Sequence, residues 1–379
     1  MIIGVPTEIK NNEERVALVP RGVEALTRAG NEILIQQDAG LGSDISNEAF
    51  QKAGATMIKN AEKIWQKADM ILKVKEPIKQ EFNFFKYLVD KILFTYLHLS
   101  GVDPRLTQAL LKHRVTALAY ETVENKKGEL PLLEPMSEIA AIIGVQEGAH
   151  YLMRQFKGRG VTLGEVSGIE SAHVVIVGGG TVGAKSARTA LGMGSRVTIL
   201  EKNPERINYL RQTLEKKFSK VSIIISNEKN LEKYTRDADL LIGAVLVKGS
   251  AAPHIITREM IENMHAGSVV VDIAIDQGGC TELSKPTTHS KPIFYSKNGV
   301  IFYCVTNMPA QASLQATYAL TAATLPYILD ITKKGVGDAL KNNQGFMKGL
   351  NTHAGYITYR HVAQDLGMQK YFRNTTALL

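Results

Sequence analysis

Four ionisable side chains lie in or beside loops that are expected to follow strands: Arg15, Lys75, His98 and Asp276. Arg15 could hold a carboxylate through its guanidinium fork, and Lys75 could hold one as a point charge. An imidazole such as that of His98 can act as an acid or as a base, and Asp276 precedes two glycines that allow a ligand close to the backbone. Two cations, an imidazole and a carboxylate are together suited to oxidise an amino acid or a 2-hydroxy acid beside a nicotinamide.

Each of these residues also has a simpler interpretation. Taken alone, Arg15 and Lys75 would be surface cations, His98 a packed strand residue, and Asp276 the cap of a turn. The four residues therefore predict chemistry only as a set. Their types do not choose between an amino-acid dehydrogenase and a 2-hydroxy-acid dehydrogenase.

A glycine-rich segment in the middle of the chain predicts a nucleotide site. Gly178, Gly180 and Gly183 have G-x-G-x-x-G spacing and follow the apolar run 174–177. They would permit a tight turn, close approach of a pyrophosphate, and close contact between helix and strand. The helix that follows would hold the pyrophosphate at its N-terminus. The alternative is a glycine-rich turn that binds no ligand.

Glu201 ends the next expected strand, 23 residues after Gly178. There its carboxylate can accept hydrogen bonds from both hydroxyls of an adenosine ribose. NAD is preferred over NADP because a 2′-phosphate would meet this negative charge. Lys202, the next residue, weakens that preference slightly.

Composition excludes several other classes of protein. With 379 residues, 44% of them hydrophobic, the chain can form two cored domains. It shows no membrane-spanning run and no signal-peptide pattern, so a cytoplasmic protein is expected.

The two cysteines, Cys280 and Cys304, have the spacing of neither a disulfide framework nor a metal site. We expect packed cysteine side chains and no metal. The net charge is +8, but the lysines and arginines are spread along the chain and alternate with acidic residues, which argues against nucleic-acid binding.

Strands and helices alternate along most of the chain, which predicts an α/β fold with two Rossmann-like domains on parallel sheets. Strands are expected at 2–5, 32–37, near 57, 70–77, 91–99, 115–119, 174–177, 196–200, 222–225, 238–244, 268–272 and 301–305. Helices are expected at 20–29, 47–53, 61–68, 137–154, 184–192, from 205, at 257–263 and at 315–331.

Two proline-containing hinges, 130–135 and 307–309, divide the chain. Ser137 is expected to cap the helix that follows the first hinge. From Gln311 the chain should be mostly helical and, because no strand-rich sheet is left for it to complete, should pack on the first domain. We therefore predict a substrate domain from 1–131 and 309–379, an inserted NAD-binding domain at 132–308, and a cleft between them.

The chain resembles the family that contains the alanine dehydrogenases and the alpha subunit of proton-translocating nicotinamide nucleotide transhydrogenase. The resemblance covers nearly the whole chain in the family's order. Its motifs lie at 3–10, 14–18, 74–77, 94–99 and 135–138, in the glycine loop, and at 271–279 and 307–309.

This resemblance implies reversible, NAD-dependent oxidative deamination of L-alanine to pyruvate and ammonium. Arg15 and Lys75 would bind the substrate carboxylate, and His98 and Asp276 would perform the acid–base steps. The implied cofactor contacts are Ser137, Gly178, Gly180, Thr181, Val182, Gly183, Glu201, Arg206, Ser226, Val245, Leu246, Ile273, Ala274, Ile275, Asp276, Val305, Thr306, Asn307 and Met308. A homohexamer is implied as well.

The sequence departs from the family pattern at 310–314 and at Glu134 and Ile142, close to the expected hinges. These changes bear on turnover and domain closure. Two alternatives stay open. A transhydrogenase alpha subunit is disfavoured by the complete set of four residues and by the lack of a transmembrane tail. A non-catalytic dinucleotide-sensing protein would bind NADH without using His98.

Overall fold

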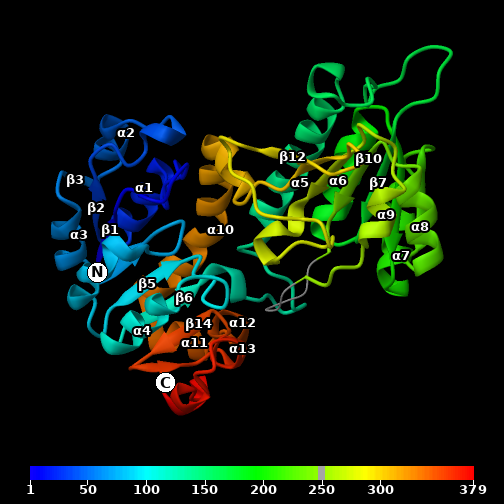
Figure 1. Ribbon diagram of the computed structural model, residues 1–379. Coiled ribbons are helices and arrows are strands. Elements are labelled where there is room, and N and C mark those ends of the chain that lie inside the picture. Colours follow the sequence, from blue (N-terminus) through cyan, green and yellow to red (C-terminus); the bar gives the residue numbers. More distant parts are fainter. Residues whose placement is uncertain (246–251) are drawn as a thin grey trace. The chain divides into compact units, whose positions relative to one another are not determined.

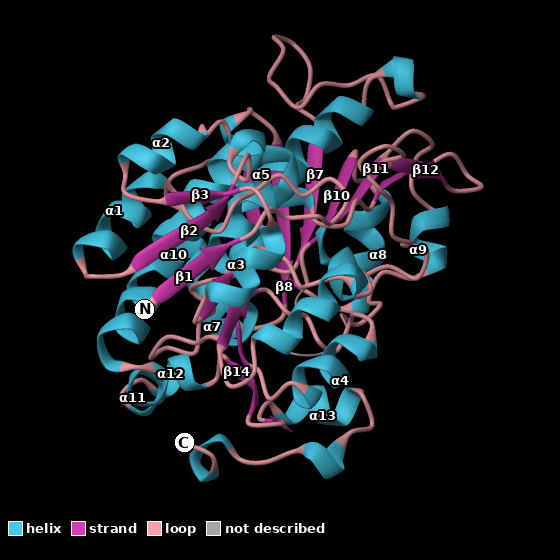
Figure 2. Cartoon of the chain, turned by 90° about the vertical axis from the view of Figure 1, so that its left-hand side faces the viewer, coloured by secondary structure: helices cyan, strands magenta, loops and turns pink. Residues whose placement is uncertain are grey.

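The computed structural model describes residues 1–245 and 252–379. The chain divides into two compact units: unit 1 comprises 1–136 and 310–379, and unit 2 comprises 137–309 (Figure 1). Each unit contains one sheet together with helices (Figure 2). Both sheets are mostly parallel, so the predicted α/β class is confirmed.

The sheet of unit 1 has eight strands in the order β15-β14-β6-β5-β4-β1-β2-β3. Its parallel part consists of β1 (Ile2–Val5), β2 (Glu32–Gln36), β3 (Thr56–Ile58), β4 (Met70–Leu72), β5 (Ile92–Thr95) and β6 (Thr116–Ala119). The helices of this unit are α1 (Pro20–Arg28), α2 (Asn47–Lys52), α3 (Ala61–Lys67), α4 (Pro104–Lys112), α10 (Ser313–Lys334), α11 (Val336–Lys341), α12 (Gln344–Met347) and α13 (Arg360–Asp365). β4, β5 and β6 are buried along their whole length, as expected for central parallel strands.

The sheet of unit 2 has seven strands in the order β12-β13-β11-β10-β7-β8-β9. These are β7 (His173–Val177), β8 (Arg196–Glu201), β9 (Val221–Ile225), β10 (Leu240–Gly243), β11 (Val269–Asp272), β12 (Ile293–Tyr295) and β13 (Ile301–Tyr303). Its helices are most of α5 (Glu134–Tyr151), α6 (Thr181–Gly192), α7 (Pro204–Leu210), α8 (Glu228–Arg236) and α9 (Arg258–Glu262). β7 pairs in parallel with β10 and β8, which puts the glycine loop in the middle of the sheet.

Helix α5 (Glu134–Tyr151) begins three residues before the predicted start. The carbonyl of Leu130 accepts the N–H groups of Leu133 and Glu134, so the hinge turns directly into the helix. Pro135 lies in the first turn, where its missing N–H costs no hydrogen bond. The prediction that Ser137 caps this helix is therefore wrong, because Ser137 lies inside it.

Two predicted strands are shorter than expected. β4 ends at Leu72 instead of Pro77, and β5 ends at Thr95 instead of Leu99. In both cases a side-chain carboxylate accepts the N–H groups that a longer strand would have paired with its neighbour. Lys75 and His98 therefore lie on loops beyond the strand ends.

The expectation that the C-terminal region completes no sheet is also wrong. β14 (Leu350–His353) and β15 (Tyr356–Ile357) form a hairpin, and β14 pairs antiparallel with β6 at the sheet edge. The C-terminal region belongs to unit 1 and contains the long helix α10. In unit 2, β12 is a further antiparallel edge strand that the sequence did not predict.

Candidate active site

The glycine loop connects β7 to α6, and each of its three motif glycines has its own steric environment. Gly178 has φ +100°, a region that favours glycine. A Cβ on Gly183 would lie 1.9 Å from the carbonyl oxygen of Gly178, so only glycine fits between loop and helix. A Cβ on Gly180 would meet no atom within 4 Å. The loop is thus closely packed at its base and open at Gly180, where a pyrophosphate would approach.

Helix α6 begins at Thr181 without a side-chain cap. The first N–H groups of a helix have no partner within the helix, and here they follow directly on the open glycine. Thr181 is exposed and Val182 is half-buried. The helix start therefore has the chemistry of an anion site.

Glu201 is fixed at the end of β8 beside the glycine loop. Its Oε2 accepts the N–H of Gly179 at 2.7 Å, and its Oε1 accepts those of Lys202 and Asn203 at 2.8 Å each. These hydrogen bonds keep the carboxylate of Glu201, the predicted ribose ligand, next to the glycine loop, the predicted pyrophosphate site.

Arg206 supports the same loop from its carbonyl side. Its Nε donates to the carbonyl of Gly179 at 2.5 Å, and its Nη2 donates to that of Gly180 at 3.1 Å. The guanidinium also lies over the ring of Tyr209, 4.5 Å from the centroid. In this structure Arg206 shapes the loop, a contact that the sequence did not predict.

The remaining predicted cofactor positions of unit 2 follow the carboxyl ends of its parallel strands. This is the edge at which ligands bind in open α/β sheets. Ser226 follows β9, Val245 follows β10, the segment 273–276 follows β11, and the segment 305–308 follows β13. Leu246 lies outside the described residues. Ser137 is a half-buried residue of α5.

Asp276 is exposed in the short helix Ile273–Gln277 after β11, and its carboxylate accepts the N–H of Asn307 at 3.2 Å. Buried Asp272 orders this loop by accepting the N–H of Cys280 at 2.8 Å and the hydroxyl of Ser284 at 2.6 Å. Burial raises the pKa of the Cys280 thiol well above its ordinary value, and raises that of Cys304 to about 12. Both cysteines are free, buried thiols, in agreement with the prediction of packed side chains.

In unit 1, Arg15, Lys75 and His98 follow β1, β4 and β5, which are neighbouring parallel strands. Arg15 is 2% exposed and binds Glu13 through Nε at 2.7 Å and Nη2 at 2.6 Å. Its Nη1 meets the sulfur of Met136 at 3.0 Å, a weak acceptor. Burial lowers the pKa of Arg15, but the charge and hydrogen bond of Glu13, together with smaller contributions from other groups, outweigh burial and raise the pKa.

Lys75 is buried, and its Nζ lies 4.0 Å from Oε2 of Glu76. Glu76 also pairs with Lys10. Burial raises the pKa of Glu76, but the charges of Lys75 and Lys10 outweigh it, so the pKa lies below its ordinary value. This carboxylate therefore stays ionised next to the ammonium group of Lys75.

His98 is partly exposed, with a side-chain exposure of 37%, and has a left-handed backbone with φ +46°. Its N–H donates to Oε1 of Glu121 at 2.6 Å, and its Nδ1 lies 3.9 Å from the same oxygen. Its ring stacks on that of Tyr96 with 5.7 Å between centroids.

The sequence did not predict the carboxylates of Glu13, Glu76 and Glu121, although each of them contacts a predicted site residue. Glu13 and Glu76 are close to their partners in sequence, so an acid near each cation was an available signal. Glu121 lies 23 residues from His98, in the short helix Tyr120–Thr122, and no local pattern marks it.

Family models described as "Alanine dehydrogenase/PNT, N-terminal domain" and "Alanine dehydrogenase/PNT, C-terminal domain" match residues 4–140 and 144–360. The chain belongs to the alanine dehydrogenase/PNT family. The resemblance inferred from the sequence motifs is therefore confirmed.

Several members of this family are similar to this chain over nearly their full length. Alanine dehydrogenase of Methanococcus maripaludis is 50% identical over 365 residues, 96% of each chain. Alanine dehydrogenase of Mycobacterium tuberculosis is 47% identical over 368 residues, 97% of each chain. A solved structure of L-alanine dehydrogenase superposes with a TM-score of 0.91 at 43% identity, covering 97% of this chain and 99% of that one. A transhydrogenase structure from Sinorhizobium meliloti, 22% identical with a TM-score of 0.80, shares the fold.

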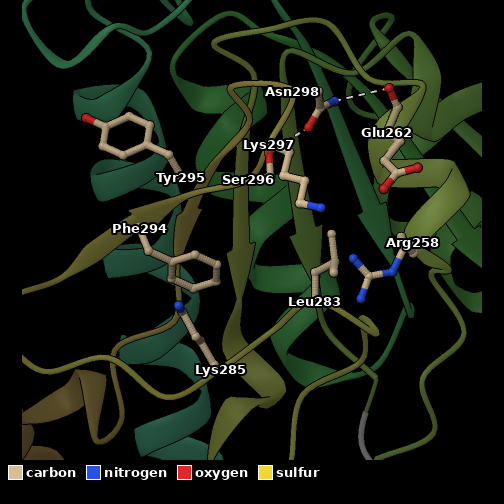
Figure 3. A pocket seen from close by; sticks show the side chains of 9 residues that line it. All are labelled: Arg258, Glu262, Leu283, Lys285, Phe294, Tyr295, Ser296, Lys297 and Asn298. Atoms are coloured by element: carbon tan, nitrogen blue, oxygen red, sulfur yellow. Dashed lines mark hydrogen bonds between the residues drawn. The ribbon is translucent and has the colours of Figure 1, made fainter.

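A separate pocket in unit 2 contains none of the predicted site residues (Figure 3). Among its lining residues, Lys285 lies over the ring of Phe294, with its Nζ 4.4 Å from the ring centroid, and Asn298 donates to the carbonyl of Glu262 at 3.1 Å.

Within residues 1–245 and 252–379, no helix is long and apolar enough to cross a membrane. The same residues contain no group of three His, Cys, Asp or Glu side chains that could hold a metal ion.

Proposed function

We propose that this protein is an NAD-dependent L-alanine dehydrogenase. The observation that carries the proposal is the full-length identity of 43–50% to proteins named alanine dehydrogenase. The grouping of Arg15, Lys75 and His98 after adjacent strands supports it. The overall reaction converts L-alanine, NAD and water into pyruvate, ammonium, NADH and a proton.

The residues of unit 2 fit a dinucleotide. Gly180 is sterically open, the start of α6 is uncapped, and Glu201 lies beside the loop. Bound NAD would supply the hydride acceptor. The glycine loop and α6 would hold the pyrophosphate, and Glu201 would hold the adenosine ribose and disfavour a 2′-phosphate. The other family positions, from Ser137 to Met308, would complete the contacts.

The residues of unit 1 would bind the substrate. Lys75 offers a point charge for the carboxylate, and Arg15 offers a guanidinium fork, the geometry that suits a carboxylate. His98 would take a proton from the amine as the Cα hydride leaves, and would pass it to solvent. It would then take a proton from water as the water oxygen bonds to the imine carbon, and would give that proton to the nitrogen of the carbinolamine. The C–N bond then breaks and ammonia leaves, while the hydroxyl loses its proton and becomes the carbonyl of pyruvate. Asp276 would hold the amine or the attacking water.

This assignment makes unit 1 the substrate domain and unit 2 the NAD domain. Of the two acid–base residues, His98 belongs to unit 1 and Asp276 to unit 2. A homohexamer, as the family resemblance implies, is part of the proposal.

The test is the absorbance of NADH with purified protein. L-Alanine with NAD should produce NADH, and pyruvate with ammonium should consume it. D-Alanine and lactate serve as matched controls, and neither should react. If NADH binds but neither direction turns over, the proposal is wrong and a dinucleotide-sensing role takes its place.

A further inference from the structure

A buried network of three charges lies beneath the loop that carries Lys75. The Nζ of Lys73 is 3.0 Å from Oε2 of Glu8 and 2.9 Å from Oε1 of Glu81. All three side chains are less than 5% exposed. Buried charges are costly unless they are paired and hydrogen-bonded, and this network contains two carboxylates for one ammonium.

The second oxygen of each carboxylate accepts main-chain N–H groups of that loop. Oε1 of Glu8 accepts those of Val74 at 2.6 Å and Lys75 at 3.3 Å. Oε2 of Glu81 accepts that of Ile78 at 3.0 Å. The network therefore holds both ends of segment 74–78, which lies beyond the regular strand β4.

The two lysines of this region have different electrostatic partners. Lys73 is bound by two buried carboxylates, whereas Lys75 has Glu76 at 4.0 Å, and Glu76 also pairs with Lys10. Burial would lower the pKa of Lys73, but Glu8 and Glu81 outweigh burial and raise the pKa above its ordinary value. Lys73 is thus a permanent structural cation, and Lys75 is the lysine whose charge is less compensated.

We propose that Glu8 is a positioning residue: its carboxylate fixes the main chain at Lys75, so that this ammonium, and not that of Lys73, meets the substrate carboxylate. The inference rests on the proposed function and extends it to a residue that would not touch the substrate. Glu81 belongs to the same network but contacts the main chain at Ile78, three residues beyond Lys75.

The test compares Glu8→Gln with Glu81→Gln, which removes an equally buried charge from the same Lys73, and with Glu32→Gln, which removes an exposed carboxylate from β2. Each holoenzyme is assayed for kcat, for the KM of pyruvate and for the Kd of NADH. Glu8→Gln should raise the KM of pyruvate at least about tenfold, with a smaller change in kcat and an unchanged Kd. Glu81→Gln and Glu32→Gln should leave this KM unchanged.

Amide hydrogen exchange gives a readout independent of turnover, because loss of the Glu8 carboxylate should speed exchange in a peptide that covers 73–76. If Glu8→Gln does not fold, Glu8→Asp replaces it: the shorter side chain keeps the charge for Lys73 but draws the acceptor away from the N–H of Lys75. If Glu8→Gln and Glu81→Gln raise the KM of pyruvate equally, the cause is general destabilisation and the proposal is overturned. An unchanged KM of pyruvate in an active Glu8 variant would overturn the positioning role of Glu8 and leave the proposed function intact. A wild type without turnover would overturn the proposed function, and the role of Glu8 with it.

Discussion

The carboxylate of Glu121 accepts the main-chain N–H of His98 at 2.6 Å, and the same oxygen lies 3.9 Å from Nδ1 of the imidazole. His98 has φ +46°, a conformation that residues other than glycine adopt rarely and at a cost. Glu121 also accepts the N–H of Leu97 at 3.2 Å. One carboxylate therefore holds the left-handed turn that presents the imidazole.

Replacing Glu121 by Ala should misplace the imidazole. We expect kcat/KM for L-alanine to fall roughly tenfold, because the left-handed backbone loses the acceptor that holds it. The Kd of NADH should stay constant. Glu124→Ala, which removes a carboxylate paired with exposed Lys348, is the control. Equal activity in the two variants would show that Glu121 does not position His98.

The form of the glycine loop was largely predictable from sequence, because its determinants are local. The spacing of Gly178, Gly180 and Gly183 dictates a loop with three distinct steric requirements, and Glu201 follows at the end of the next strand. The ends of β4 and β5 were not predictable. They depend on Glu8 and Glu121, which lie 66 and 23 residues from the N–H groups that they accept.

The C-terminal hairpin escaped prediction for a related reason. β14 reads Leu350-Asn-Thr-His, with one apolar residue in four, and it becomes a strand because β6 offers a free edge. Such short polar strands are specified by a distant partner and not by their own periodicity.

The glycine loop offers a matched pair of substitutions within one helix. Gly183→Ala places a Cβ 1.9 Å from the carbonyl of Gly178, so the loop must move, whereas Gly192→Ala at the end of α6 meets nothing within 4 Å. We expect Gly183→Ala to weaken NADH binding and to lower the free energy of unfolding by about 1–3 kcal/mol. Gly192→Ala should leave both unchanged or slightly raise stability. Fluorescence titration with NADH and thermal unfolding measure the two effects, and full NADH affinity in Gly183→Ala would refute the assigned packing.

Glu201→Ala should reduce the preference for NAD over NADP. Its carboxylate would hold the ribose hydroxyls and repel a 2′-phosphate, so NADH affinity should fall roughly tenfold while NADPH affinity rises or holds. Glu205→Ala removes an exposed carboxylate from neighbouring α7 and serves as the control. The measurement is the ratio of Kd values for the two cofactors. A ratio identical to that of the wild type would exclude Glu201 from ribose recognition.

Acid should destabilise unit 2 through His173. Burial lowers the pKa of this imidazole, whose Nε2 lies 2.9 Å from Oγ1 of Thr198. Because the folded state binds the proton less readily than the unfolded chain, stability is present above the ordinary pKa of about 6.5 and is lost as the pH falls towards the lower folded value. The loss can reach about 1.4 kcal/mol per pH unit.

Replacing His173 by Gln should flatten this dependence of thermal unfolding between about pH 6.5 and pH 5. His361→Gln, at an exposed position of α13, should keep the wild-type slope. An unchanged slope in His173→Gln would assign the acid sensitivity to other groups.

The most direct test of the account is turnover by His98→Ala, measured together with NADH binding. If His98 is the acid–base group of an alanine dehydrogenase, kcat should fall at least about 100-fold for L-alanine oxidation and for pyruvate amination. NADH should bind as in the wild type, and His361→Ala should retain full activity. A His98→Ala variant that oxidises L-alanine at the wild-type rate would contradict the account.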